Sequence, residues 1–228
     1  MKELMIKPEI YHFDKVKEFA EEFQIGEGDL MVTNQYIYEP FFGALNLKCD
    51  VIFQEKYGQG EPSDDMVEAM YKDIKGLHKR VIAVGGGTVI DISKLFALKD
   101  VSPVLDLYDG KIPPVKDKEL VLVPTTCGTG SEVTAGAVLS DKEKGIKAAI
   151  FSPLIFPAIA LVDPELTYTV PAKVTASTGL DVLAHSFDAM TSVKANPATD
   201  ALALGAAKLA VKYLQRAVKD GQDKEARA

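Results

Sequence analysis

Residues 80–94, read RVIAVGGGTVIDISK, constrain the fold of this chain more than any other stretch. Residues 81–84 form a short apolar run, rich in β-branched side chains, that is typical of a buried strand. The run stops at three consecutive glycines, 85–87, and from Thr88 the apolar positions recur at helical spacing. The pattern predicts a buried strand, a tight turn and then a helix, with Thr88 as the residue that caps the helix start.

The glycine turn predicts a phosphate-binding site. Glycines have no Cβ to keep a ligand away from the backbone, and the N–H groups at the start of a helix attract negatively charged oxygens. A strand-to-helix turn without any ligand fits the same residues, because the full G-x-G-x-x-G spacing of the dinucleotide fingerprint is missing. The turn alone leaves both interpretations open.

The segments around this turn indicate an α/β fold. Alternating strands and helices joined by short links favour a Rossmann-like, mostly parallel sheet covered by helices, with ligands at the carboxyl ends of the strands. We expect further strands over 30–33, 50–54, 120–123 and 158–162, weak helix over 41–47, a helix over 66–77 begun by Ser63 and Asp64, and a hairpin of 135–140 with 147–151.

From residue 171 onward the pattern is helical without any strand. We therefore predict two domains: a dinucleotide-binding α/β domain over residues 1–169 and the start of a helical, metal-binding domain over residues 170–228. In the second predicted helix an apolar stripe runs from Leu202 to Leu214 without a partner helix in the remaining chain. This stripe predicts that the helical domain is incomplete or packs on something outside the chain.

A second polar loop, PTTCGTGSEVT over residues 124–134, follows the strand predicted at 120–123. Its five hydroxyl side chains and two glycines suit phosphate and ribose oxygens, although ordinary solvent loops have the same composition. If both strands lie in one sheet, this loop and the glycine turn lie at the same edge. Cys127 within it has no histidine nearby in sequence, so we expect it to fill space rather than to act as a nucleophile.

The first predicted helix of the second domain carries candidate metal ligands. Asp181, His185 and Asp188 follow one another at intervals of four and three residues, which places them on one strip of the helix. With apolar neighbours on both sides, this strip is expected to be partly buried, and a divalent metal would supply the charge that a buried carboxylate needs. An Asp–His pair that satisfies itself on a half-exposed helix is the alternative. We expect His12 and His78 to be surface or structural residues.

Composition excludes several classes of protein. The 33 acidic and 26 basic residues give a net charge of −7, which argues against nucleic acid or an anionic membrane as a partner. No apolar run is long enough to span a bilayer, and the N-terminus lacks a signal-peptide core. The two cysteines lie far apart in sequence, as expected of reduced thiols in a cytoplasmic protein.

Four motifs together resemble the iron-containing alcohol dehydrogenase family, in the same order and at similar intervals. They are GGGTVIDISK, PTTCGTGSEVT, VDPELT at 162–167, and TGLDVLAHSFDAMTS, so the resemblance covers nearly the whole chain. Within the family, residues 28–41 and 51–66 are most similar to the 4-hydroxybutyrate dehydrogenases. The implied substrate is a small primary alcohol or aldehyde, with 4-hydroxybutyrate and succinate semialdehyde as the candidate pair.

The resemblance also implies site residues. Cofactor contacts are implied at Asn34, Gly86, Gly87, Thr88, Thr125, Thr126, Gly128, Thr129, Val138, Lys147 and Leu166, and metal ligation with a catalytic role at Asp181 and His185. The family's two remaining metal ligands are histidines further along, beyond residue 228. Many members have an Asp where this chain has Asn34, which leaves the choice between NAD and NADP open.

The implied mechanism is hydride transfer between NAD(P) and the substrate. A divalent metal, iron by family and zinc or manganese by ligand chemistry, would act as a Lewis acid on the substrate oxygen. We expect a homo-oligomer, and we expect residues 1–228 by themselves to have little or no activity. A lyase of the dehydroquinate synthase type and a dinucleotide-binding fragment without catalysis are the alternatives.

Overall fold

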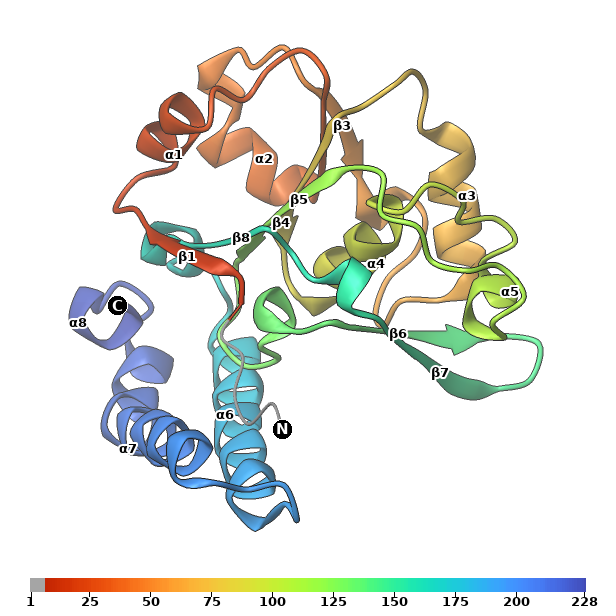
Figure 1. The fold of residues 1–228 in the computed structure, drawn as a ribbon. Helices are drawn as coiled ribbons and strands as arrows, with labels where there is room; N and C mark the ends of the chain where they lie inside the picture. Colours follow the sequence, from red (N-terminus) through yellow and green to blue (C-terminus); the bar gives the residue numbers. More distant parts are fainter. Residues whose placement is uncertain (1–6) are drawn as a thin grey trace. The chain divides into compact units, whose positions relative to one another are not determined.

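A computed structural model describes residues 7–228, and its main feature is a six-stranded, fully parallel sheet (Figure 1). The strands lie in the order β1-β8-β5-β4-β2-β3. Their bounds are β1 Glu9–His12, β2 Asp29–Thr33, β3 Asp50–Phe53, β4 Arg80–Gly85, β5 Glu119–Pro124 and β8 Ile159–Val162. The predicted Rossmann-like α/β class is confirmed, and the structure adds β1, which the sequence pattern did not indicate.

The buried run of β4 lies near the middle of the sheet, between β5 and β2. Successive side chains of a strand point to opposite faces, so both faces of β4 must be covered. Val81 and Ala83 belong to the apolar cluster formed with α3 (Asp64–Asp73), α4 (Gly87–Phe96) and α5 (Val104–Tyr108), while Ile82 and Val84 are buried outside that cluster. Figure 1 draws α1 (Val16–Glu22) and α2 (Gln35–Phe41) on the other side of the sheet.

Two helix starts test the predicted caps. Ser63 caps α3 as predicted, with its Oγ accepting a hydrogen bond from the Met66 N–H at 3.4 Å. For α4 the prediction is wrong, since the helix begins at Gly87 and Gly86 is the capping residue, in extended conformation. Thr88 already lies inside the first turn, and its hydroxyl donates to the carbonyl oxygen of Gly60 at 2.8 Å.

Other differences are short elements with weak sequence signals. The predicted helix over 66–77 is α3, which ends at Asp73. The predicted weak helix over 41–47 is wrong: the unpredicted helix α2 ends at Phe41, where that range begins, and only a 3-10 turn at Gly43–Leu45 lies within it. α1 and α5 were not predicted. The predicted hairpin is confirmed as the antiparallel pair β6 (Gly136–Asp141) and β7 (Ile146–Phe151).

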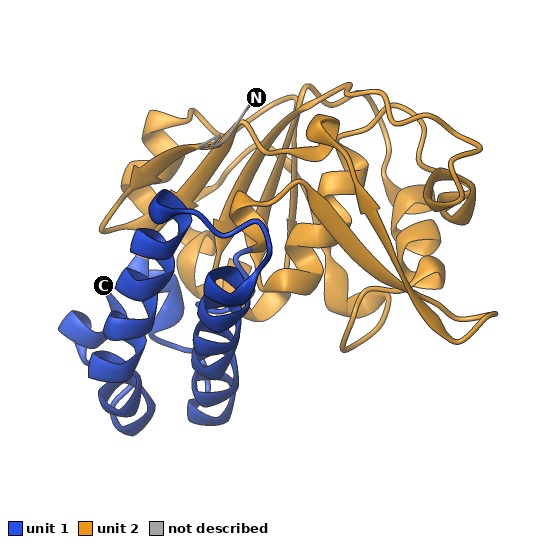
Figure 2. Cartoon of the chain, turned by 60° about the horizontal axis from the view of Figure 1, so that its bottom comes forward, with its two compact units in different colours: residues 1–6, 125–130, 164–228 blue, residues 7–124, 131–163 orange. Residues whose placement is uncertain are grey.

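The chain divides into two compact units, coloured separately in Figure 2. One comprises residues 7–124 and 131–163 and holds the sheet and the hairpin; the other comprises residues 125–130 and 164–228. The predicted domain boundary lies at 169/170, six residues after this division, and it does not separate the loop 125–130 from the sheet. Among the described residues, no helix combines the length and the apolar content needed to cross a bilayer.

The helical unit is built on two long antiparallel neighbours, α6 (Ala172–Thr191) and α7 (Pro197–Lys219). Asn196 starts α7 with a capping box. Its side chain accepts a hydrogen bond from the Thr199 N–H, and the Thr199 hydroxyl accepts one from the Asn196 N–H. The helices approach closely at Gly179, where an added Cβ would lie 2.1 Å from the Leu214 side chain. A glycine inside a helix is intrinsically unfavourable, so here it serves this close approach.

We expect Gly179→Val to lower the free energy of unfolding by about 1–3 kcal/mol, because the branched side chain must push Leu214 aside. Gly205→Ala is the matched control, since no atom lies within 4 Å of a Cβ at that position of α7. It should raise stability by about 0.5–1 kcal/mol through helix propensity. Urea unfolding followed by circular dichroism measures both, and equal effects at the two positions would contradict the close approach.

Candidate functional site

The candidate cofactor site lies at the carboxyl edge of the parallel sheet. β4 ends at Gly85 directly beside Pro124, the last residue of β5, and Ala83 lies beside Val32 near the end of β2. Because the strands are parallel and in this register, the segments that follow β2, β4 and β5 all leave from one edge. Ligands of such sheets bind at that edge.

The glycine turn is shaped by close packing of α4 on β4. A Cβ at Gly85 would lie 2.6 Å from Cβ of Val89, so only glycine lets the helix start this near the strand. The first intrahelical hydrogen bond runs from the Ile90 N–H to the Gly86 carbonyl. N–H groups earlier in a helix have no partner within it and can bind an anion. Gly86, Gly87 and Thr88 thus present the backbone that the sequence predicts for a pyrophosphate.

A buried lysine holds the hairpin against α4. The Lys94 side chain is fully buried and donates to the Asp91 carboxylate at 3.1 Å, to the Thr134 hydroxyl at 3.0 Å and to the Gly136 carbonyl at 2.5 Å. The other Asp91 oxygen accepts from the Val138 N–H at 3.2 Å. Burial lowers the pKa of the Lys94 ammonium, and the Asp91 charge opposes that shift. The predicted cofactor contact Val138 is therefore positioned by a buried ion pair that the sequence analysis missed.

Lys147, the other predicted contact on the hairpin, forms an ion pair. Its ammonium lies 2.8 Å from the Glu61 carboxylate, and both side chains are about two-thirds exposed. Such exposed pairs contribute little to stability, so Lys147 can exchange Glu61 for a ligand oxygen at small cost.

The second polar loop belongs to the helical unit and is packed against α6. A Cβ at Gly128 would lie 2.5 Å from the backbone oxygen of Thr178, so the loop meets the helix backbone directly. Thr125 is buried, Thr126 is partly exposed and Thr129 is exposed, whereas Leu166 is 2% exposed. The meeting of this loop with the glycine turn over one ligand stays a prediction. Cys127 is exposed, so its expected role as a buried space filler is wrong.

Within the helical unit, α6, α7 and residues 125–127 line a partly open cavity of about 340 Å³. α6 lines it with Thr175, Thr178, Gly179 and Val182, which share one face of the helix. The opposing wall is mostly apolar and comes from α7 (Ala206, Leu209, Ala210, Tyr213, Leu214 and Ala217). A cavity of this size and character suits a small, largely apolar group.

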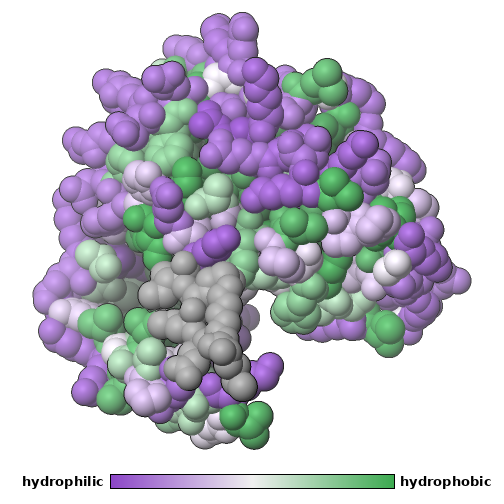
Figure 3. All heavy atoms as spheres, in the orientation of Figure 1, coloured by the Kyte–Doolittle hydropathy of each residue, from purple (hydrophilic) through white to green (hydrophobic). Residues whose placement is uncertain are grey.

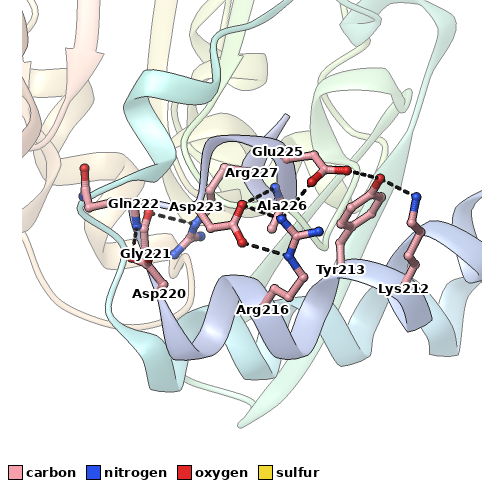
Figure 4. A network of polar contacts seen from close by, with 10 residues as sticks. All are labelled: Lys212, Tyr213, Arg216, Asp220, Gly221, Gln222, Asp223, Glu225, Ala226 and Arg227. Carbon is pink, nitrogen blue, oxygen red and sulfur yellow. Dashed lines mark hydrogen bonds and ion pairs between the residues drawn. The ribbon is translucent and has the colours of Figure 1, made fainter.

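A polar network joins the end of α7 to the residues that follow it (Figure 4). Arg216 binds Asp223 through two hydrogen bonds, of 2.8 and 2.9 Å, and Glu225 through a third, while Glu225 also accepts from the Tyr213 hydroxyl. Hydrogen bonds from Arg216 lower the pKa of both carboxyls. Arg227 donates to the Thr175 hydroxyl on α6, which ties the short helix α8 (Lys224–Arg227) to both long helices.

The candidate metal ligands lie on a different face of α6. Asp181, His185 and Asp188 are exposed, so the expected partial burial of this strip is wrong for the described chain. The physical reason is that α6 turns Thr175, Gly179 and Ser186 inward, and a strip offset from these residues on the helix has no neighbour to cover it. Among residues 7–228, no three His, Cys, Asp or Glu side chains are grouped so that they could hold a metal ion.

The predicted structural roles of His12 and His78 agree with their surroundings. His12 is exposed on β1, and the buried His78 contacts the Asp50 carboxylate at 2.8 Å through Nε2. Neither residue joins the candidate site.

Comparison with known proteins places the chain in a family. Residues 8–164 match the profile of iron-containing alcohol dehydrogenases, and residues 175–228 match the C-terminal profile of the Fe-containing alcohol dehydrogenase family. The chain therefore belongs to the iron-containing alcohol dehydrogenase family, and the predicted resemblance is confirmed.

Two relatives and one solved structure illustrate the similarity. The chain is 43% identical to 4-hydroxybutyrate dehydrogenase of Clostridium kluyveri over 98% of its own length and 60% of that protein. It is 42% identical to 1-propanol dehydrogenase of Salmonella typhimurium over 62% of its length and 35% of that protein. The structure of sulfoacetaldehyde reductase from Bifidobacterium kashiwanohense in complex with NAD+ superposes with a TM-score of 0.86 at 33% identity, covering all of this chain and 63% of the other. The chain thus spans about three fifths of the Clostridium and Bifidobacterium proteins.

Lys94→Met should lower the free energy of unfolding by about 2–3 kcal/mol, because it leaves the partly buried Asp91 carboxylate without its partner charge. Lys79→Met, at an exposed site, should change stability by less than about 0.5 kcal/mol. A double variant with Asp91→Asn should lose clearly less than the sum of the single losses. Chemical denaturation of the unchanged chain, the three single variants (Asp91→Asn included) and the double variant measures this, and additive losses would mean that Lys94 and Asp91 act independently.

Proposed function

We propose that this chain is the dinucleotide-binding part of an alcohol dehydrogenase that transfers a hydride between NAD(P) and a small primary alcohol or aldehyde. The observation that carries the proposal is the glycine turn between β4 and α4, at the sheet edge that β5 shares. Family membership supports the reaction class, and the NAD+ complex of the Bifidobacterium relative supports the cofactor.

The roles proposed for this chain's residues follow from the sheet edge. Gly86, Gly87 and Thr88 hold the pyrophosphate through backbone N–H groups, and the hydroxyls of the loop 125–130 supply further hydrogen bonds. Val138, Lys147 and Leu166 are the proposed contacts toward the nicotinamide end. Asn34 follows β2 and is proposed at the adenosine ribose.

The name of the Clostridium relative suggests the substrate pair 4-hydroxybutyrate and succinate semialdehyde. Its similarity extends along 98% of the chain, whereas the 1-propanol dehydrogenase covers 62%. We infer this substrate class for the whole protein. A homo-oligomer in the cytoplasm remains our expectation.

The implied iron fits only in part. Asp181 and His185 are one helical turn apart and offer the carboxylate and imidazole donors that iron accepts. Catalytic metal sites hold their metal with three or more protein ligands, and the described residues group no third donor with these two. The described chain therefore does not complete a metal site, and the proposal for it rests on dinucleotide binding.

A fluorescence titration with NADH tests the proposal on the full chain, which should bind saturably. Gly86→Asp should weaken binding at least about tenfold, because its carboxylate repels the pyrophosphate at the helix start. Gly86 has an extended backbone (φ −77°, ψ −175°), and Asp is a better capping residue than Gly, so α4 should not be destabilised.

Gly205→Asp is the control, since it makes the same chemical change on α7, where a Cβ meets no neighbour. It should bind NADH as the unchanged chain does. Equal affinity in Gly86→Asp and the unchanged chain would contradict the glycine turn as the pyrophosphate site.

A further inference from the structure

Asn34, directly after β2, is held by an acidic neighbour from the next strand. Its side-chain amide is buried and donates to the Gln54 carbonyl oxygen at 3.2 Å and to Oε2 of Glu55 at 2.8 Å. The other oxygen of Glu55 accepts from the Gln35 N–H at 2.6 Å. The carboxylate of Glu55, which follows β3, is therefore fixed beside the end of β2.

The hydrogen bonds allow only one arrangement of charge here. Gln54 donates its own amide to the Gly58 carbonyl and to the Met66 sulfur, so its oxygen must face Asn34. Both N–H groups of Asn34 then have acceptors, and the residue at position 34 acts as a donor. An Asp at this position would set a second carboxylate against Glu55 without a proton between them, which like charges disfavour.

The place of this carboxylate in the fold suggests its ligand. β2 is the direct neighbour of β4, which carries the glycine turn, and β3 is the neighbour of β2. In dinucleotide-binding sheets, an acidic residue beyond the second strand accepts hydrogen bonds from the adenosine ribose, and an Arg there accommodates the 2′-phosphate of NADP. The residue that follows Glu55 in the chain is the basic Lys56, and its ammonium lies 4.9 Å from the centre of the Phe53 ring.

We propose that Glu55 is the residue that selects NAD(H) over NADP(H). Its carboxylate accepts hydrogen bonds from the ribose hydroxyls of NAD(H) and repels a 2′-phosphate. Hydrogen bonds from the Asn34 side chain and the Gln35 N–H hold this carboxylate in place. The inference rests on the proposed function, because it assigns the specificity of that same dinucleotide site.

Separate titrations of the full chain with NADH and NADPH, followed by fluorescence, test the assignment. The unchanged chain should bind NADH at least about tenfold more tightly than NADPH. Glu55→Gln removes the charge and keeps the shape, so it should reduce that ratio at least about tenfold, mainly by tightening NADPH. Glu55→Asp keeps the charge and should retain the preference for NADH.

Glu39→Gln is the matched control, because it changes the net charge by the same amount as Glu55→Gln. Glu39 is exposed on α2 and accepts a hydrogen bond from the Gln35 side chain. It should leave the ratio unchanged. Circular dichroism and thermal unfolding of every variant confirm that the fold is kept.

The outcomes separate the two proposals. An unchanged ratio in a folded Glu55→Gln, or an equal fall of the ratio in Glu39→Gln, overturns the role of Glu55 and leaves dinucleotide binding intact. Tighter binding of NADPH than of NADH by the unchanged chain also overturns the role of Glu55 and leaves dinucleotide binding intact. Failure of the folded, unchanged chain to bind either nucleotide overturns the proposed function and this inference together.

Discussion

The candidate site depends on the contact between Gly85 and Val89, where the Val89 side chain in the first turn of α4 packs directly against the Gly85 backbone at the end of β4. This contact fixes the start of α4 against the end of β4, and the parallel register then sets Pro124 of β5 beside it. The absence of a Cβ at Gly85 is thus first a packing requirement. The same geometry leaves backbone N–H groups at the start of α4 free of partners within the helix, as the proposed pyrophosphate site requires.

Behind this turn, the ion pair of Lys94 and Asp91 does what an apolar residue could not. A buried charge is costly, and packed hydrophobic residues would often be at least as stable. The gain is directional, because besides each other the ammonium and the carboxylate bind three groups in or just before β6: the Thr134 hydroxyl, the Gly136 carbonyl and the Val138 N–H. The ion pair therefore positions the start of the hairpin against α4.

Local patterns predicted much of the fold because they report local physics. The apolar run 81–84, the Ser63 cap and the hairpin are each determined by a few adjacent residues, and the structure has all three. Short elements such as α5 and β1 have too few residues for a period to show, and β1 depends on pairing with β8, more than 140 positions later in the chain. The end of α3 at Asp73 comes four residues before the end that the apolar spacing predicts at residue 77.

The candidate site residues likewise differ in whether adjacent residues or distant contacts determine them. Backbone sites such as those proposed at Gly86 and Gly87 can be predicted from sequence because glycine itself carries the signal. Glu55 could not be, because its role depends on a hydrogen bond to Asn34 across 21 positions of the chain. Position 34 is neutral, but the net charge beside it is still negative. The Asn34 amide after β2 and the Glu55 carboxylate after β3 together carry one negative charge, as a single acidic residue at position 34 would. A motif comparison at position 34 alone indicates that an acidic residue is lost. The hydrogen-bonded pair of Asn34 and Glu55 indicates instead that the negative charge has moved from the end of β2 to the end of β3.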